Sequence, residues 1–359
     1  MLKLLHAADL HLDSPFAALS PEAARQRREE QRRLLQTLAD TCRSENCQLL
    51  FLAGDLFDGA HVYKDTVEAL IGTLKDCPAK VFIAPGNHDW LSPGSPYRTA
   101  DWPDNVHIFK QEAIECVELP ELNCRVYGAG FCHEHVGSLL EGFAAPTDGF
   151  ANLMVLHGDP TGGADYNPIT KEQIAGSNLT YLALGHIHKG DQLRVGSTLC
   201  AWPGCPMGRG FDECGDKGAL LVTQESGGFE AQFLPLGARR YEILEVKASD
   251  DPLAAILSAL PEDTGRDVYR IVLTGESRGV DRAALYAALQ NRFDALELVD
   301  KTVPPLELWA AAGEDSLKGR FLAGLKARYE QAEGRDKETV LLAARYGLSI
   351  FEEREVAPL

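Results

Sequence analysis

The sequence predicts an α/β fold, because short apolar runs alternate with helix-like stretches from residue 2 to about residue 236. Six such runs stand at residues 4–8, 49–53, 81–84, 153–156, 181–184 and 219–222. Longer helix-like segments separate the first three, which gives a β-α-β rhythm. Strands that are apolar without interruption are buried on both faces. We therefore expect layers packed on each side of a sheet.

Three parts are predicted along the chain of 359 residues, 45% of which are hydrophobic. Residues 1–236 hold the apolar runs. Residues 237–302 alternate strand-like and helix-like segments, which predicts a small α+β domain. Residues 303–359 form a helical segment with an apolar stripe of Phe321, Leu322, Leu325 and Tyr329. Packing within the chain and docking on another protein both account for such a stripe.

Composition argues against a membrane or secreted protein. No apolar stretch approaches the ~18 residues of a membrane-spanning helix. The polar motif Asp9-Leu10-His11 lies inside the first ~15 to 30 residues, which a secretory signal would occupy. Nine cysteines without a CxxC pair are expected to be reduced thiols. We expect a cytoplasmic protein.

The formal net charge of −18 restricts the partners. Binding to a polyanion is normally driven by Lys and Arg side chains that neutralise phosphates. If the substrate is DNA, a local basic patch, divalent cations or a second subunit must supply the attraction. A homodimer and a different partner protein both stay open.

Polar clusters directly follow five of the apolar runs, at Asp9, Asp55, Gly86-Asn87-His88, His157 and Gly185-His186. Singly each cluster is weak, because a surface turn or a loop that tolerates positive φ accounts for it. All five clusters, however, directly follow an apolar run, which separate surface turns would not explain. In α/β sheets, ligand sites lie beyond the strand ends, so one shared site is expected.

Seven side chains of these clusters suit a site for two divalent cations: Asp9, His11, Asp55, Asn87, His157, His186 and His188. Two cations ~3.5 to 4 Å apart need a bridging carboxylate, oxygen ligands and neutral imidazoles. Asp55 suits the bridge. The first cation would be completed by Asp9, His11 and His188, and the second by Asn87, His157 and His186. Manganese (Mn2+) suits such ligands, while iron and zinc stay open.

These motifs resemble those of the calcineurin-like metallophosphoesterases. They are Asp9-x-His11, Gly54-Asp55, Gly86-Asn87-His88-Asp89, His157-Gly158-Asp159 and Gly185-His186-Ile187-His188, in the order of the family. The longer strings at residues 8–13, 53–58, 203–207 and 210–213 resemble the SbcD-like DNA-repair exonucleases of the YhaO-type subgroup. The resemblance covers residues 1–236 strongly and the remainder only in general plan.

The resemblance implies a layered α/β/β/α metallophosphoesterase sandwich, a capping domain at residues 237–302 and C-terminal helices. It implies a two-metal DNA exonuclease of DNA repair, with endonuclease action also open. It further implies an SMC-like coiled-coil ATPase partner of the SbcC-like kind, which residues 303–359 would bind. A partner that holds the duplex would also overcome the unfavourable net charge.

The resemblance gives His88 the role of assisting the leaving group, by donating a proton or a hydrogen bond to the departing oxygen. Asp89 either orients His88 or caps its loop. Arg209 belongs to a glycine-rich loop that begins at Trp202. It either contacts a substrate phosphate or lies in a plain turn.

Two other functions stay open. A phosphatase or cyclic-nucleotide phosphodiesterase would use the same metals, because fold and metal chemistry do not fix the substrate. A non-catalytic scaffold would be expected to lose ligands, and all seven are present. A minimal phosphatase does not need the about 120 residues after Leu236, so the sequence favours DNA cleavage.

Overall fold

The computed structural model describes residues 1–359 apart from 60–61, 163–164, 250, 278, 304–306 and 353–359. The chain divides into two compact units, Met1–Arg240 and Tyr241–Leu359. The predicted boundaries after residues 236 and 302 stay predictions.

Two six-stranded sheets form the first unit. In the first sheet four parallel strands are extended by an antiparallel pair, in the order β12-β11-β1-β2-β3-β4. The bounds are β1 Lys3–Ala7, β2 Leu49–Leu52, β3 Lys80–Ile83, β4 Val106–Ile108, β11 Gly218–Glu225 and β12 Gly228–Pro235. Strand β11, which comes late in the sequence of this unit, thus pairs with its first strand, β1.

The second sheet has the order β5-β6-β7-β8-β10-β9, with antiparallel strands at its two edges. The bounds are β5 Glu115–Leu119, β6 Cys124–Gly128, β7 Ala151–His157, β8 Tyr181–Gly185, β9 Lys189–Val195 and β10 Thr198–Gly204. The predicted loop from Trp202 onward is wrong for residues 202–204. They end β10, because Trp202 pairs with Asp191 of β9 and its side chain is buried.

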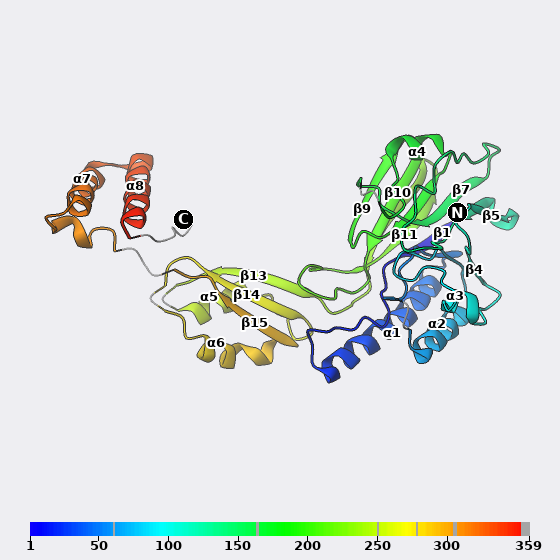
Figure 1. Cartoon of the computed structure of the whole chain (residues 1–359), viewed down its shortest axis with the longest axis horizontal. Coiled ribbons are helices and arrows are strands. Elements are labelled where there is room, and N and C mark those ends of the chain that lie inside the picture. The colour runs from blue at the N-terminus through cyan, green and yellow to red at the C-terminus, as the bar shows by residue number, and fades with distance from the viewer. Residues whose placement is uncertain (60–61, 163–164, 250, 278, 304–306, 353–359) are drawn as a thin grey trace. The chain divides into compact units, whose positions relative to one another are not determined.

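Helices cover the outer face of each sheet (Figure 1). Helices α1 (Pro21–Ser44) and α2 (Lys64–Asp76) pack on the first sheet, and α4 (Lys171–Gly176) packs on the second. The other short helices are α3 at Pro96–Thr99 and a 3₁₀ turn at Pro120–Leu122. The layered α/β/β/α architecture predicted from the sequence is confirmed.

The hydrophobic core follows the alternation of side chains along each strand. Leu4 and Phe51 lie in the cluster between the two sheets, while Leu5 and Leu50 lie in the cluster under α1 and α2. Both faces of these strands are therefore buried, which explains their continuous apolar sequence.

Helix α1 has a clear start and a role at the sheet end. The Ser20 side chain accepts a hydrogen bond from the Ala23 N–H, and Pro21 occupies the first turn. Further along, the buried Gln31 side chain donates to the carbonyl oxygen of His11 at 2.7 Å. The helix thus holds the backbone that follows β1.

The second unit contains a parallel sheet in the order β13-β14-β15, with bounds Tyr241–Lys247, Val268–Thr274 and Ala295–Asp300. Helices α5 (Pro252–Ala259) and α6 (Arg282–Leu289) connect consecutive strands. Leu244, Ile271 and Leu298 stand opposite one another and pack with these helices. Short 3₁₀ turns lie at Gln290–Arg292 and Ala310–Gly313.

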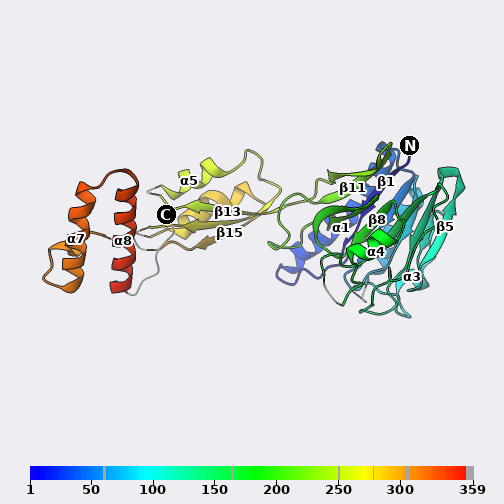
Figure 2. The same cartoon turned by 90° about the horizontal axis from the view of Figure 1, so that it is seen from above.

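Helices α7 (Leu317–Gln331) and α8 (Gly334–Glu352) lie side by side (Figure 2). Leu322, Ala344 and Leu348 form the contact between them. Of the predicted stripe, Leu322 is buried in this contact, while Phe321 is 38% exposed and places its ring against Gly347 and Phe351 of α8. Within the described ranges, no helix combines the length and the apolar character that crossing a membrane requires.

Candidate metal centre

The carboxyl ends of parallel strands from both sheets meet at one place in the first unit. Four predicted ligands follow β1, β2 and β3 of the first sheet, and three end or follow β7 and β8 of the second. The structure brings together all seven: Asp9, His11, Asp55, Asn87, His157, His186 and His188.

Four of these residues adopt a backbone conformation that residues other than glycine rarely adopt. The φ angle is +53° at Asp9, +44° at His11, +51° at Asp55 and +93° at His186. Such conformations cost about 1–3 kcal/mol each and persist where the surroundings over-determine them. The Gln31 hydrogen bond to the backbone of His11 is one such constraint.

His11 and His188 turn their Nε2 atoms toward one another at 3.1 Å. The Nδ1 atom of His11 lies 2.8 Å from Asp58 Oδ1, and that of His188 lies 2.6 Å from Glu213 Oε1. Because an ionised carboxylate only accepts, each Nδ1 carries the proton and each Nε2 keeps its lone pair. Two facing lone pairs repel unless a proton or a metal ion lies between them. With Asp9, whose Oδ1 is 4.0 Å from His188 Nε2, they form the set predicted for the first cation.

The set predicted for the second cation converges in a similar way. Asn87 Oδ1 lies 2.9 Å from His157 Nε2 and 3.1 Å from His186 Nδ1. His157 Nδ1 donates to the Ala53 carbonyl oxygen at 3.0 Å, so Nε2 is the atom that would bind a metal. Gly54 permits this packing, because a Cβ there would stand 2.3 Å from His157 Nδ1.

Asp55 lies between the two sets. Its Oδ2 atom is 3.4 Å from His157 Nε2 and 3.9 Å from His11 Nε2, so one oxygen reaches a ligand of each predicted cation. Its Oδ1 atom accepts the backbone N–H of His88 at 2.9 Å. Asp9 also has a carboxylate oxygen within reach of both sets. The placement of Asp55 suits the role of bridging the two cations, and this role stays a prediction.

The electrostatics of the centre fit divalent cations. Asp9 and Asp55 are each 1% exposed, and burial raises the pKa of Asp9 to about 7. Burial disfavours charged His157, but the adjacent Asp55 outweighs this and raises the pKa of His157 to about 9. Protons thus compensate the buried carboxylates, and bound metal ions would take the place of these protons. Carboxylate, amide and imidazole donors suit manganese, iron or zinc.

His88 stands at the rim of the centre. Its side chain is 45% exposed, its ring lies 4.8 Å from that of His11, and its Nδ1 atom is 3.6 Å from Asp58 Oδ1. It is therefore open to solvent and close to the ligands without belonging to either predicted set.

Asp89 is buried and binds backbone rather than His88. Its Oδ1 atom accepts the Gly86 N–H at 2.7 Å, and its Oδ2 atom accepts the Leu56 N–H at 2.7 Å and the Tyr97 hydroxyl at 2.5 Å. Burial raises the pKa of Asp89. Among the described residues no hydrogen bond joins Asp89 to His88, so its contacts match the loop-capping alternative.

Arg209 lies beside the ligands in an ion-pair network. Its guanidinium is 3.2 Å from Asp58 Oδ1 and 3.0 Å from Glu213 Oε1, and its side chain is 24% exposed. These are the carboxylates that orient His11 and His188. The geometry thus gives Arg209 a positioning role, while its contact with a substrate phosphate stays a prediction.

Three residues near the centre receive no role from the sequence. Asp58 and Glu213 belong to the strings that carry the family resemblance, and that membership is the signal that could have identified them. Tyr166, in the loop after β7, places its ring 5.0 Å from the His186 ring. Tyr166 belongs to none of the quoted motifs, so only the folded chain reveals its position near His186.

The comparisons with known proteins agree with this geometry. A family model described as calcineurin-like phosphoesterase matches residues 2–190. The chain is 34% identical over 281 residues to a protein described as uncharacterized metallophosphoesterase YhaO, from Bacillus subtilis (strain 168). That match covers 73% of this chain and 67% of the relative.

The solved structures that match the chain have low sequence identity to it. A dimetal phosphatase from Danio rerio is 12% identical with a TM-score of 0.42, covering 66% of this chain and 99% of that chain. A novel archaeal phosphodiesterase is 13% identical with a TM-score of 0.35, covering 65% of this chain and 100% of that chain.

Proposed function

The chain belongs to the calcineurin-like phosphoesterase family and is a metal-dependent phosphoesterase, and we propose that it hydrolyses phosphodiester bonds in DNA. The proposed reaction is exonucleolytic, with endonuclease action as a second mode, and serves DNA repair. The observation that supports a DNA substrate is the presence of a second folded unit, Tyr241–Leu359, which hydrolysis of a small ester does not need. The sequence strings that resemble SbcD-like exonucleases support the same substrate.

The residues of the centre would divide the chemistry as follows. The seven ligands would hold two divalent cations, preferably manganese, which activate water and offset negative charge on the phosphate. His88, open to solvent at the rim, would hold a proton at the departing oxygen. General acid catalysis of this kind typically contributes ~10² to 10⁴-fold. Asp58, 3.6 Å from His88 Nδ1, would keep that imidazole oriented.

An SMC-like coiled-coil ATPase is the partner that we propose. The net charge of −18 opposes binding of the isolated chain to DNA, and a partner that holds the duplex removes this difficulty. Helices α7 and α8 leave Leu317 and Ile350 77% and 79% exposed. Apolar side chains exposed to this extent on one helical pair suit a protein partner.

The test compares His88→Ala with wild type in a nuclease assay on duplex and single-stranded DNA, with manganese or with chelator. We expect cleavage to require metal and to fall at least 100-fold in His88→Ala, with the bound manganese unchanged. His133→Ala is the matched control, because His133 is exposed and belongs to neither ligand set. Full activity of His88→Ala would refute the role of His88.

A phosphatase or cyclic-nucleotide phosphodiesterase is the second candidate, and the acidity of the chain favours it. A small phosphate ester needs no extended basic surface, so the net charge of −18 does not oppose its binding. If the wild type hydrolyses a simple phosphomonoester in manganese but leaves both forms of DNA intact, this second function replaces the first.

A further inference from the structure

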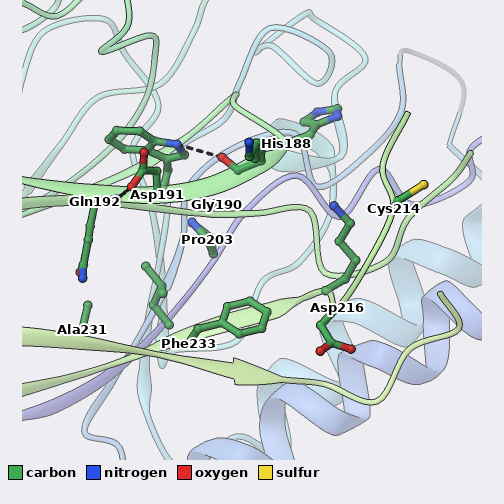
Figure 3. A pocket seen from close by; sticks show the side chains of 13 residues that line it. His188, Gly190, Asp191, Gln192, Pro203, Cys214, Asp216, Ala231 and Phe233 are labelled. Carbon is green, nitrogen blue, oxygen red and sulfur yellow. Dashed lines mark hydrogen bonds between the residues drawn. The ribbon is translucent and has the colours of Figure 1, made fainter. Parts of the chain in front are cut away.

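A cavity of about 400 Å³ lies beside the metal centre, between the edges of the two sheets in the first unit (Figure 3). Strands β9 and β10 form one wall, and β11 and β12 form the other. His188 and Cys214 stand at one end, and Gln192 and Ala231 stand at the other. His188, a predicted ligand, thus belongs both to the centre and to the cavity.

The cavity is lined by both polar and apolar side chains, among them the aromatic rings of Trp202 and Phe233. Trp202 and Leu220 are buried beneath it, and the Trp202 indole N–H donates to the Lys189 carbonyl oxygen at 3.1 Å. Phe233 on β12 is 39% exposed, although it stands in a concave site. An exposed ring inside a hollow of this size offers a face on which a flat group can stack.

The charges of the cavity are arranged unequally. Lys189 and Lys217 line it, and within the described part of the chain neither ammonium group forms an ion pair or hydrogen bond. Asp216 faces Arg240 at 3.5 Å. Asp191 stands beside Gln192, away from the end formed by His188 (Figure 3). Both lysines can therefore meet an anion, and Lys189 directly follows the predicted ligand His188 in the chain.

We propose that this cavity binds one nucleotide of a nucleic acid strand, adjoining the nucleotide whose phosphodiester lies at the metal centre. Its base stacks on Phe233, and its phosphate contacts Lys189 and Lys217. The inference rests on the proposed function. Sites that bind single strands combine an aromatic platform with a cationic path for the backbone, and such stacking tolerates any base. The volume is within the range of small-ligand sites.

The test measures binding of a labelled single-stranded oligonucleotide by fluorescence anisotropy, with manganese and phosphorothioate linkages that resist cleavage. A second strand carries abasic nucleotides throughout. We expect Phe233→Ala to weaken binding of the normal strand about tenfold and that of the abasic strand less than twofold. Lys217→Gln should weaken both strands to the same degree.

Two matched controls accompany these variants. Phe233→Trp keeps an aromatic face and should bind as wild type. Lys171→Gln removes an exposed lysine of α4, away from the cavity, and should also bind as wild type. All variants should melt at the wild-type temperature and bind manganese as wild type, because no variant changes a predicted metal ligand.

The proposal is overturned if wild type does not bind the normal strand. It is also overturned if Phe233→Ala binds that strand unchanged or loses both strands equally. A different result would refute DNA cleavage alone: Phe233-dependent binding of the normal strand by a wild type that does not cut unmodified DNA in manganese. The cavity would then stay a nucleic acid site in a protein with another reaction.

Discussion

Glu213 offers the sharpest test of how the first cation is held. Its Oε1 atom lies 2.6 Å from His188 Nδ1 and 3.0 Å from the Arg209 guanidinium. Its Oε2 atom accepts a hydrogen bond from the backbone N–H of Arg209 at 2.8 Å. Burial opposes its ionisation, but the hydrogen bond to His188 and the adjacent Arg209 hold the pKa of Glu213 well below its usual value. The carboxylate is therefore charged at neutral pH.

Replacing Glu213 with Ala removes the group that fixes the tautomer and the orientation of His188. Loss of such a partner typically costs 10- to 100-fold in metal affinity, which is about 1.4 to 2.7 kcal/mol. His188 belongs to one predicted set only. We therefore expect one manganese ion to bind 10- to 100-fold more weakly and the other to bind nearly as in wild type. Glu213→Gln, which keeps an acceptor for His188, should lie between the two.

Calorimetric titration of the metal-free protein with manganese measures both affinities. Asp212→Asn is the matched control, because Asp212 is the neighbouring carboxylate and is exposed to solvent. Thermal melting without metal should show that Glu213→Ala still folds. Equal weakening of both ions, or no weakening of either in a folded variant, would refute the reasoning that assigns His188 and Glu213 to one cation.

Two further predictions concern stability. Burial lowers the pKa of His6 to about 3, against 6.5 in an unfolded chain. The folding stability that depends on neutral His6 is therefore complete above pH 6.5 and is lost as the pH falls toward 3. At pH 5 the loss is ~2 kcal/mol, and urea unfolding of His6→Gln should show a correspondingly smaller pH dependence. Gly185→Ala would place a Cβ 1.9 Å from the Ala53 carbonyl oxygen, so we expect a loss of about 1–3 kcal/mol in thermal melting and weaker manganese binding. An unchanged melting temperature would contradict this.

Local patterns predicted the elements of this chain well. The apolar run at residues 181–184 lies within β8, and the helix-like segments expected in residues 237–302 correspond to α5 and α6. These signals are strong because each depends on side chains within one strand or one helix. The ligands were predictable for a related reason. Polar residues directly after a buried strand, such as Asp55 after β2, have few places to lie other than the sheet end.

Features that depend on contacts distant in the sequence could not be predicted. Strand β9 is mostly exposed, so it lacks the apolar run that identifies the central strands. Trp202 reads as part of a glycine-rich loop until the pairing of β10 with β9 is known. Asp58 and Glu213 stand in the strings that resemble the family, but their roles depend on the imidazoles that they meet, 47 and 25 residues away in the chain. Periodicity contains no information of this kind.

The net charge of the chain therefore indicates less about its substrate than do the ion pairs formed by its arginine and lysine side chains. Arg209 is held by Asp58 and Glu213, and Arg125 is held by Glu118 and Asp148. A phosphate that took the place of Asp58 and Glu213, whose side chains are 14% and 6% exposed, would leave these carboxylates without their cation. Within this chain, attraction for a polyanion then rests on bound metal ions and on cations without such partners among the described residues, such as Lys189 and Lys217. For an acidic chain, this requirement predicts that strand binding depends steeply on a few positions, whereas a broad basic surface would spread the effect over many.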